Sequence, residues 1–250
     1  MDLNVFPLQH LSSGNPADCG KSIIIEGLIG CGKSSLAEAM GAALGQETLI
    51  QTEPDERGNA NPFLQDFYRE PHRWAFTMQM RLLYMRVRAH QLAQWYVTNT
   101  PHWAVMDRSV YGDTAFAHLQ LKMKQMTEDE FDTYSGMYHT LTHFLPYPNV
   151  CIRLLVSPEK SFQRVQERKE KREGRECESV ISLEYLTNLD KEISKTLGVL
   201  QQQGVTVLEV PWEKDRPTEE ERFEAAKEIV GVIQRKDIRN TFLDLHRRSM

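Results

Sequence analysis

The sequence predicts an α/β fold in which a five-stranded parallel sheet is flanked by helices. Five short runs rich in β-branched and aliphatic residues alternate with longer helical segments. A glycine-rich loop directly follows the first run and leads into a helix. Polar groups also follow the second and third runs, at the strand ends where parallel sheets bind their ligands. Strands that alternate with helices form right-handed crossovers, so helices should cover both faces of the sheet.

The expected elements follow from these runs. The first strand is Ser-Ile-Ile-Ile-Glu at 22–26, and Pro54 ends the second because proline cannot donate to a sheet ladder. We expect strands at 22–26, 48–52, 103–107, 150–155 and 205–210. Between and after them we expect helices at about 33–45, 62–70, 72–99, 112–123, 128–145, 157–170, 182–203 and 218–235.

The loop after the first strand has the spacing Gly-x-x-x-x-Gly-Lys-Ser. Such a loop turns its backbone N–H groups toward a phosphate, and the following helix directs its positive end at the same anion. Lys33 then reaches the β- and γ-phosphate oxygens, and the Ser34 hydroxyl faces Mg²⁺. We therefore expect ATP to contact Gly27, Leu28, Ile29, Gly30, Cys31, Gly32, Lys33, Ser34 and Ser35.

Composition narrows the class of protein. The 250 residues suit one domain at 22–250, preceded by a flexible leader at 1–21. The formal net charge of −5 argues against a general nucleic-acid binder. The four scattered cysteines, one of them in the glycine-rich loop, favour a reducing compartment. With no targeting signal or membrane-length apolar run in view, we expect a cytoplasmic protein with no membrane partner.

Together the motifs resemble those of the deoxynucleoside kinases. They are the glycine-rich loop, Glu53-Pro54, Tyr68 eleven residues before Gln79, and Asp107-Arg108-Ser109. The similarity spans about 22–190, and the short segment after Glu53 is most like that of bacterial purine deoxynucleoside kinases. It implies a P-loop kinase fold with an arginine-rich lid and transfer of the γ-phosphoryl group of ATP to the 5′-hydroxyl of a deoxynucleoside. It also implies a homodimer.

The chemistry of the residues agrees with that activity. A neutral alcohol is a poor nucleophile, so a carboxylate should lie near it to accept its proton. Glu53, at a strand end facing the loop, is the candidate base. Asp107 would hold Mg²⁺ together with Ser34, and Arg108 would neutralise charge around the transferred group.

Residues 164–176 are rich in arginine. For Arg164 and Lys169 we expect ion pairs within a solvated helix. In the family a lid closes over ATP and carries arginines into the site, and the resemblance places that lid at about 168–179. It identifies Arg175 and Arg172 as catalytic lid arginines and Arg168 as an ATP contact.

Another set of residues is expected to bind the nucleoside. The Gln79 carboxamide offers a donor and an acceptor to a base. The resemblance assigns Arg86 and Asp113 to the base, with a buried Arg86–Asp113 ion pair as the alternative. An ionised Asp113 repels a thymine carbonyl, which favours deoxyadenosine, deoxyguanosine or deoxycytidine over thymidine. The resemblance further assigns Tyr68 and Glu178 to the sugar 3′-hydroxyl and Phe116 to stacking on the base.

Three other interpretations fit parts of the sequence. A nucleoside monophosphate kinase of the thymidylate kinase type shares the loop and the Asp-Arg motif, but its acceptor needs further cationic groups. A nucleotide-dependent switch would read guanine through an Asn-Lys-x-Asp motif, which the sequence lacks. His139 and His143 lie one helical turn apart, but without the glutamate of a zinc protease they are interpreted as ordinary helix residues.

Overall fold

The computed structural model describes residues 19–53, 61–171 and 181–235. These residues form a five-stranded sheet in the order β2-β3-β1-β4-β5, in which every neighbouring pair is parallel. The predicted α/β class is confirmed. The strands are β1 (Ser22–Glu26), β2 (Leu49–Gln51), β3 (Ala104–Asp107), β4 (Val150–Leu155) and β5 (Thr206–Pro211).

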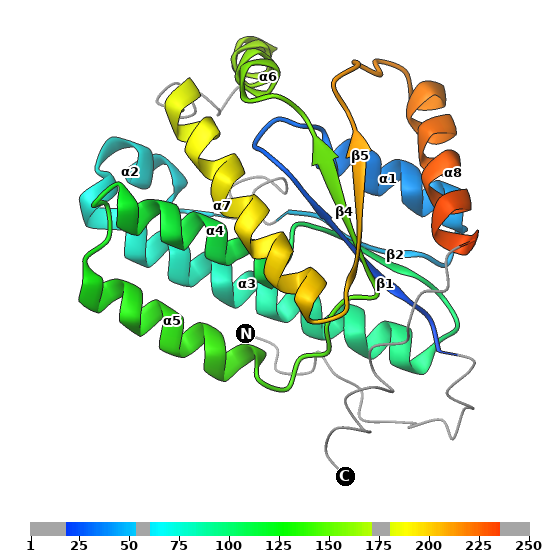
Figure 1. The fold of residues 1–250 in the computed structure, drawn as a ribbon, viewed down its shortest axis with the longest axis horizontal. Helices are drawn as coiled ribbons and strands as arrows, with labels where there is room; N and C mark the ends of the chain where they lie inside the picture. Colours follow the sequence, from blue (N-terminus) through cyan, green and yellow to red (C-terminus); the bar gives the residue numbers. More distant parts are fainter. Residues whose placement is uncertain (1–18, 54–60, 172–180, 236–250) are drawn as a thin grey trace.

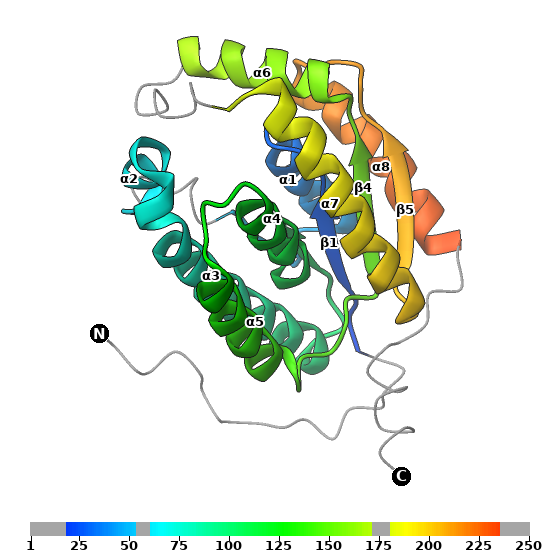
Figure 2. The same ribbon diagram turned by 60° about the vertical axis from the view of Figure 1, so that its left-hand side comes forward.

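Helices cover both faces of the sheet (Figure 1). One face carries α1 and α8, the other carries α3, α4 and α7, and α5 packs outside α3 and α4 (Figure 2). Helix α6 follows β4 at the carboxyl edge of the sheet. The helices are α1 (Lys33–Leu44), α2 (Leu64–Arg69), α3 (Pro71–Asn99), α4 (Val110–Lys122), α5 (Glu128–Thr142), α6 (Pro158–Lys171), α7 (Leu183–Gln202) and α8 (Glu219–Arg235).

These elements lie within a few residues of the expected bounds. Helix α4 begins earlier than expected, because Ser109 caps it: the Ser109 hydroxyl accepts a hydrogen bond from the Gly112 N–H at 3.0 Å. Of the predicted leader, residues 1–18 lie outside the described part of the chain. Gly20 follows them and donates its N–H to two carbonyls at the end of α3, each at 2.8 Å.

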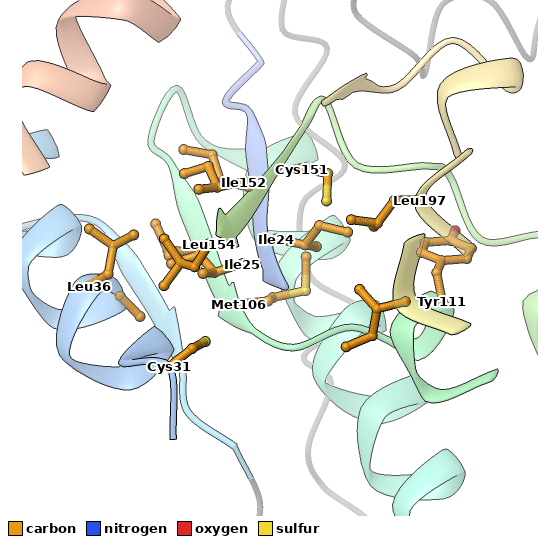
Figure 3. Close-up of a cluster of buried hydrophobic side chains, with 14 of the residues drawn as sticks. Ile24, Ile25, Cys31, Leu36, Met106, Tyr111, Cys151, Ile152, Leu154 and Leu197 are labelled. Carbon is orange, nitrogen blue, oxygen red and sulfur yellow. The ribbon is translucent and has the colours of Figure 1, made fainter. Parts of the chain in front are cut away.

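The core lies on both sides of the central strands. Ile24 and Cys151 point toward α7, whereas Ile25 and Ile152 point toward Leu36 of α1 (Figure 3). All five side chains are fully buried. Burying an aliphatic side chain of this size stabilises the fold by about 1.5–3 kcal/mol, so the apolar run in β1 fixes the centre of the sheet.

The strand register brings the candidate functional residues together at the carboxyl edge of the sheet. Ile25 of β1 pairs with Asp107 of β3, and the Arg108 N–H donates to the Ile25 carbonyl at 3.0 Å. The loop after β1 and the turn after β3 therefore begin side by side. None of the helices in the described residues is long and apolar enough to span a membrane.

Candidate active site

The glycine-rich loop connects β1 to α1 and takes backbone conformations that favour glycine. Gly30 and Gly32 have φ values of +79° and +98°. A Cβ at Gly32 would lie 3.0 Å from the indole nitrogen of Trp212, so the loop also packs closely on the segment after β5. Lys33 is buried, and its ammonium group donates to the Leu28 carbonyl at 2.9 Å. The loop is thus held in a curled form with its lysine inside.

Ser34 and Asp107 bring oxygen atoms together beside the loop. The Ser34 hydroxyl donates to Asp107 Oδ2 at 2.5 Å. Burial, followed by the nearby charge of Glu53, raises the pKa of Asp107 to about 6. Asp107 Oδ1 is buried and has no hydrogen-bond partner among the described residues.

These oxygens fit Mg²⁺, which prefers oxygen ligands and takes few from the protein when phosphates supply the others. The described residues contain no group of three or more His, Cys, Asp or Glu side chains able to hold a metal alone. Any Mg²⁺ bound at Ser34 and Asp107 would therefore depend on the nucleotide for its remaining ligands.

Glu53, just after β2, faces two arginines. Its Oε1 lies 2.7 Å from Arg108 Nε and 3.2 Å from an Arg86 terminal nitrogen. Burial opposes ionisation, but the charges of Arg108, Lys33 and Arg86 outweigh it and hold the pKa of Glu53 at about 2. The carboxylate is therefore ionised at neutral pH and able to accept a proton.

Arg108 adopts an uncommon backbone conformation, with φ at +65°. Its guanidinium donates to the Gly27 carbonyl at 3.1 Å and lies 4.8 Å from the centre of the Phe116 ring. The side chain and the backbone of Arg108 thus connect the turn after β3 to the start of the phosphate loop.

A buried cluster surrounds Asp113, which has no exposed surface. Arg86 forms a close ion pair with its Oδ1. The Gln79 amide and the Tyr134 hydroxyl donate to its Oδ2 at 2.7 and 2.6 Å. The Arg86–Asp113 ion pair weighed from the sequence is therefore present. Tyr134 was not predicted, because its position in α5 carries no motif and its contact depends on how α5 packs on α4.

One cavity of about 320 Å³ joins the phosphate loop to these groups. Gln79 and Asp113 do not line it but connect to it through Arg86. Arg172, Arg175 and Glu178 lie outside the described residues. The predicted site residues that line the cavity are Ile29, Gly30, Gly32, Lys33, Ser34, Ser35, Glu53, Tyr68, Arg86, Arg108, Phe116 and Arg168.

The far end of the cavity is largely apolar and aromatic. Tyr185 lines it, and burial raises the pKa of that hydroxyl to about 12. Apolar side chains from α2 and α3 complete this end: Leu64, Phe67, Met78 and Leu82. Their helical spacing resembles that of ordinary core residues, so no sequence pattern indicates that they face a cavity.

A second hollow of about 340 Å³ shares Gly32, Ser35, Arg164 and Arg168 with the first. The segment after β5 supplies its other side, where the Arg216 guanidinium lies 3.8 Å from the Trp212 ring centre.

Arg164 was expected to form ion pairs within its own helix, and that interpretation was wrong. Its guanidinium donates to the carbonyls of Cys31, Trp212 and Glu213 at 3.4, 3.1 and 2.9 Å, and it pairs with Asp215. It therefore connects α6 to both loops around the second hollow.

Comparison with known proteins agrees with this geometry. The family model described as deoxynucleoside kinase matches residues 23–234. A deoxyadenosine kinase of Dictyostelium discoideum is 34% identical over 193 residues, which cover 77% of this chain and 73% of that protein. A deoxyguanosine kinase of the same organism is 34% identical over 192 residues, covering 77% and 64%. A solved deoxyadenosine kinase from M. mycoides with bound dATP has a TM-score of 0.68 at 22% identity, covering 86% of this chain and all of that one (100%).

Proposed function

Because the chain belongs to the deoxynucleoside kinase family, we propose that it transfers the γ-phosphoryl group of ATP to the 5′-hydroxyl of a deoxynucleoside. Deoxyadenosine, deoxyguanosine or deoxycytidine is favoured over thymidine. One observation carries the assignment: an ionised Glu53 lines the cavity that has the phosphate loop at one end and an apolar, aromatic wall at the other. A nucleoside in that cavity would present its primary alcohol to the carboxylate.

Glu53 accepts the proton of the 5′-hydroxyl as the oxygen attacks the γ-phosphorus. Phosphoryl transfer proceeds through a loose transition state, so a weak base that is well positioned suffices. Arg108, in contact with Glu53 and lining the same cavity, stabilises the charge that develops on the transferred group.

The phosphate loop binds the donor triphosphate. Lys33 exchanges its contact with the Leu28 carbonyl for phosphate oxygens, and the backbone N–H groups at the start of α1 face the same anion. Ser34 and Asp107 would hold a Mg²⁺ ion, which when bound would neutralise charge on the phosphates of ATP. Arg108 and Lys33 add positive charge from the protein beside the phosphates.

The second hollow accommodates the adenosine part of ATP. It adjoins the phosphate loop at Gly32 and offers the indole of Trp212 and several cationic side chains. Arg168 lines both hollows and is placed to contact the donor. Arg172 and Arg175 remain predictions for a lid that closes over ATP.

The other end of the cavity binds the nucleoside. Tyr68 contacts the sugar 3′-hydroxyl, with Glu178 as a predicted second partner, and Phe116 stacks on the base. Gln79 Oε1 is buried without a hydrogen-bond partner among the described residues, but Gln79 does not line the cavity, so its contact with the base stays a prediction from the sequence. The discrimination against thymine by Asp113 stays a prediction from the sequence, because Asp113 is fully buried and paired with Arg86, which lines the cavity in its place.

Incubation of the protein with MgATP and each of the four deoxynucleosides, with dAMP as a fifth acceptor, tests the proposal. Chromatography should show 5′-monophosphates from deoxyadenosine, deoxyguanosine or deoxycytidine at higher kcat/KM than from thymidine. A chelator control should abolish turnover. Preferential phosphorylation of dAMP would instead support a nucleoside monophosphate kinase, which family membership does not favour.

The quaternary state and location stay predictions. We propose a homodimer in the cytoplasm, on the basis of the family resemblance and the scattered cysteines. Light scattering at micromolar protein concentration should give twice the chain mass of 29.0 kDa. A monomer mass would contradict the dimer and leave the proposed chemistry unaffected.

A further inference from the structure

Glu26 is a buried carboxyl group that the proposed reaction does not use. It is the last residue of β1 and immediately precedes the phosphate loop. Only 1% of its surface is exposed, and burial raises the pKa of its carboxyl. An ionisable group is costly to bury, so its contacts indicate what it does.

One carboxylate oxygen of Glu26 holds the turn after β3. Glu26 Oε1 accepts from the Ser109 N–H at 2.9 Å and from the Ser109 hydroxyl at 2.6 Å. The same hydroxyl accepts from the Gly112 N–H at 3.0 Å, which ties Glu26 to the first turn of α4. Gly112 packs so closely that a Cβ there would lie 2.3 Å from Oε1.

The other oxygen faces Arg108. Glu26 Oε2 lies 4.0 Å from an Arg108 terminal nitrogen and has no hydrogen-bond partner among the described residues. The guanidinium therefore lies between two carboxylates, Glu53 on the cavity side and Glu26 on the buried side. Arg108 also has the left-handed φ of +65°, a conformation that persists only where its surroundings hold it.

We propose that Glu26 is a positioning residue for phosphoryl transfer, acting through Ser109 and Arg108 to keep the guanidinium in place beside Glu53. The inference rests on the proposed kinase activity. When Glu53 takes the proton of the 5′-hydroxyl it becomes neutral and attracts Arg108 less. Glu26 then still holds the other side of the guanidinium, because its two hydrogen bonds with Ser109 fix the turn that carries Arg108, so Arg108 stays aligned while charge develops on the transferred group.

Glu26→Gln tests this role, because it preserves the shape of the side chain and one acceptor oxygen for Ser109 but puts an amide NH₂ group where Oε2 faces Arg108. We expect kcat to fall about tenfold, with the KM values for nucleoside and ATP changed less than about twofold, since the groups that bind both substrates remain. In an Arg108→Lys background the same change should cost less than about twofold, because a residue that acts through Arg108 loses its effect once Arg108 is altered.

Glu192→Gln is the matched control. Glu192 is also a buried glutamate, but it pairs with Lys122 on the surface between α4 and α7, so its substitution should leave kcat unchanged. If Glu26→Gln fails to fold by circular dichroism, Ser109→Ala breaks the same link from the other side. Its kcat should fall with KM preserved.

An equal loss of kcat for Glu26→Gln in the wild-type and Arg108→Lys backgrounds would overturn the inference, as would an unchanged kcat in the single variant. An inactive wild-type protein would instead overturn the proposed function. The two failures are therefore distinguishable in one set of assays.

Discussion

Substitution of Gly112 by alanine should destabilise the fold, because Gly112 packs against the Glu26 carboxylate. The added Cβ would lie 2.3 and 2.4 Å from the two carboxylate oxygens, about 1 Å closer than an ordinary contact. Glu26 cannot move away without loss, since Ser109 holds Oε1 through two hydrogen bonds. Either the carboxylate loses those bonds or the first turn of α4 shifts.

The magnitude follows from these contacts. Overpacking a buried site costs about 1–3 kcal/mol. Weakening a hydrogen bond to a buried carboxylate costs about another 1–3 kcal/mol. The helix preference of alanine returns only about 0.5–1 kcal/mol. We expect Gly112→Ala to lower the free energy of unfolding by about 2–4 kcal/mol and Tm by about 5–15 °C in a chain of this size.

Gly136→Ala is the control in thermal and urea unfolding followed by circular dichroism. Gly136 lies in α5, and a Cβ there would have no neighbour within 4 Å. This variant should therefore gain about 0.5–1 kcal/mol. If Gly112→Ala were as stable as wild type, the packing of Glu26 on α4 would be refuted.

Three further predictions concern other parts of the chain. Tyr134→Phe removes a donor to Asp113 and should lower kcat/KM for the preferred nucleoside about tenfold, largely through KM, with KM for ATP unchanged. Arg164→Lys removes several contacts to the loops of the second hollow and should raise KM for ATP about tenfold, leaving that for nucleoside unchanged. Burial, partly offset by the contact with the Pro146 carbonyl, lowers the pKa of His90 from 6.5 to about 4. Its neutral form therefore contributes stability above pH 6.5 that is lost as pH falls toward 4, about 3 kcal/mol in all, and His90→Gln should flatten Tm across that window.

Motifs that are contiguous in the sequence predicted local geometry well. The phosphate loop and its lysine follow from glycine spacing between a strand and a helix, and the structure has both flanking elements where expected. Glu53 and Arg108 were expected at one site because each follows a strand of a parallel sheet, and they contact each other at 2.7 Å. Here the strand order, rather than any single motif, brings the groups together.

Residues whose contacts depend on helix packing could not be predicted. Tyr134 reaches Asp113 only because α5 lies against α4, and Tyr185 reaches the cavity from α7. Arg164 has acidic neighbours in its own helix, but the carbonyls it contacts belong to loops that the sequence does not place beside it. In the sequence, Glu26 is only the last residue of a strand. Its contacts are with Ser109 and Arg108, which follow β3 and which the sequence does not place beside it.

Single-turnover kinetics of Glu53→Gln test the central claim most directly. The glutamine keeps the size of the side chain but removes the charge that accepts the 5′-hydroxyl proton. The account predicts that the rapid-quench rate of phosphoryl transfer falls about 10²–10⁴-fold, while the Kd for nucleoside changes only a few-fold. A transfer rate equal to that of the wild type would show that Glu53 is not the base and would contradict the account.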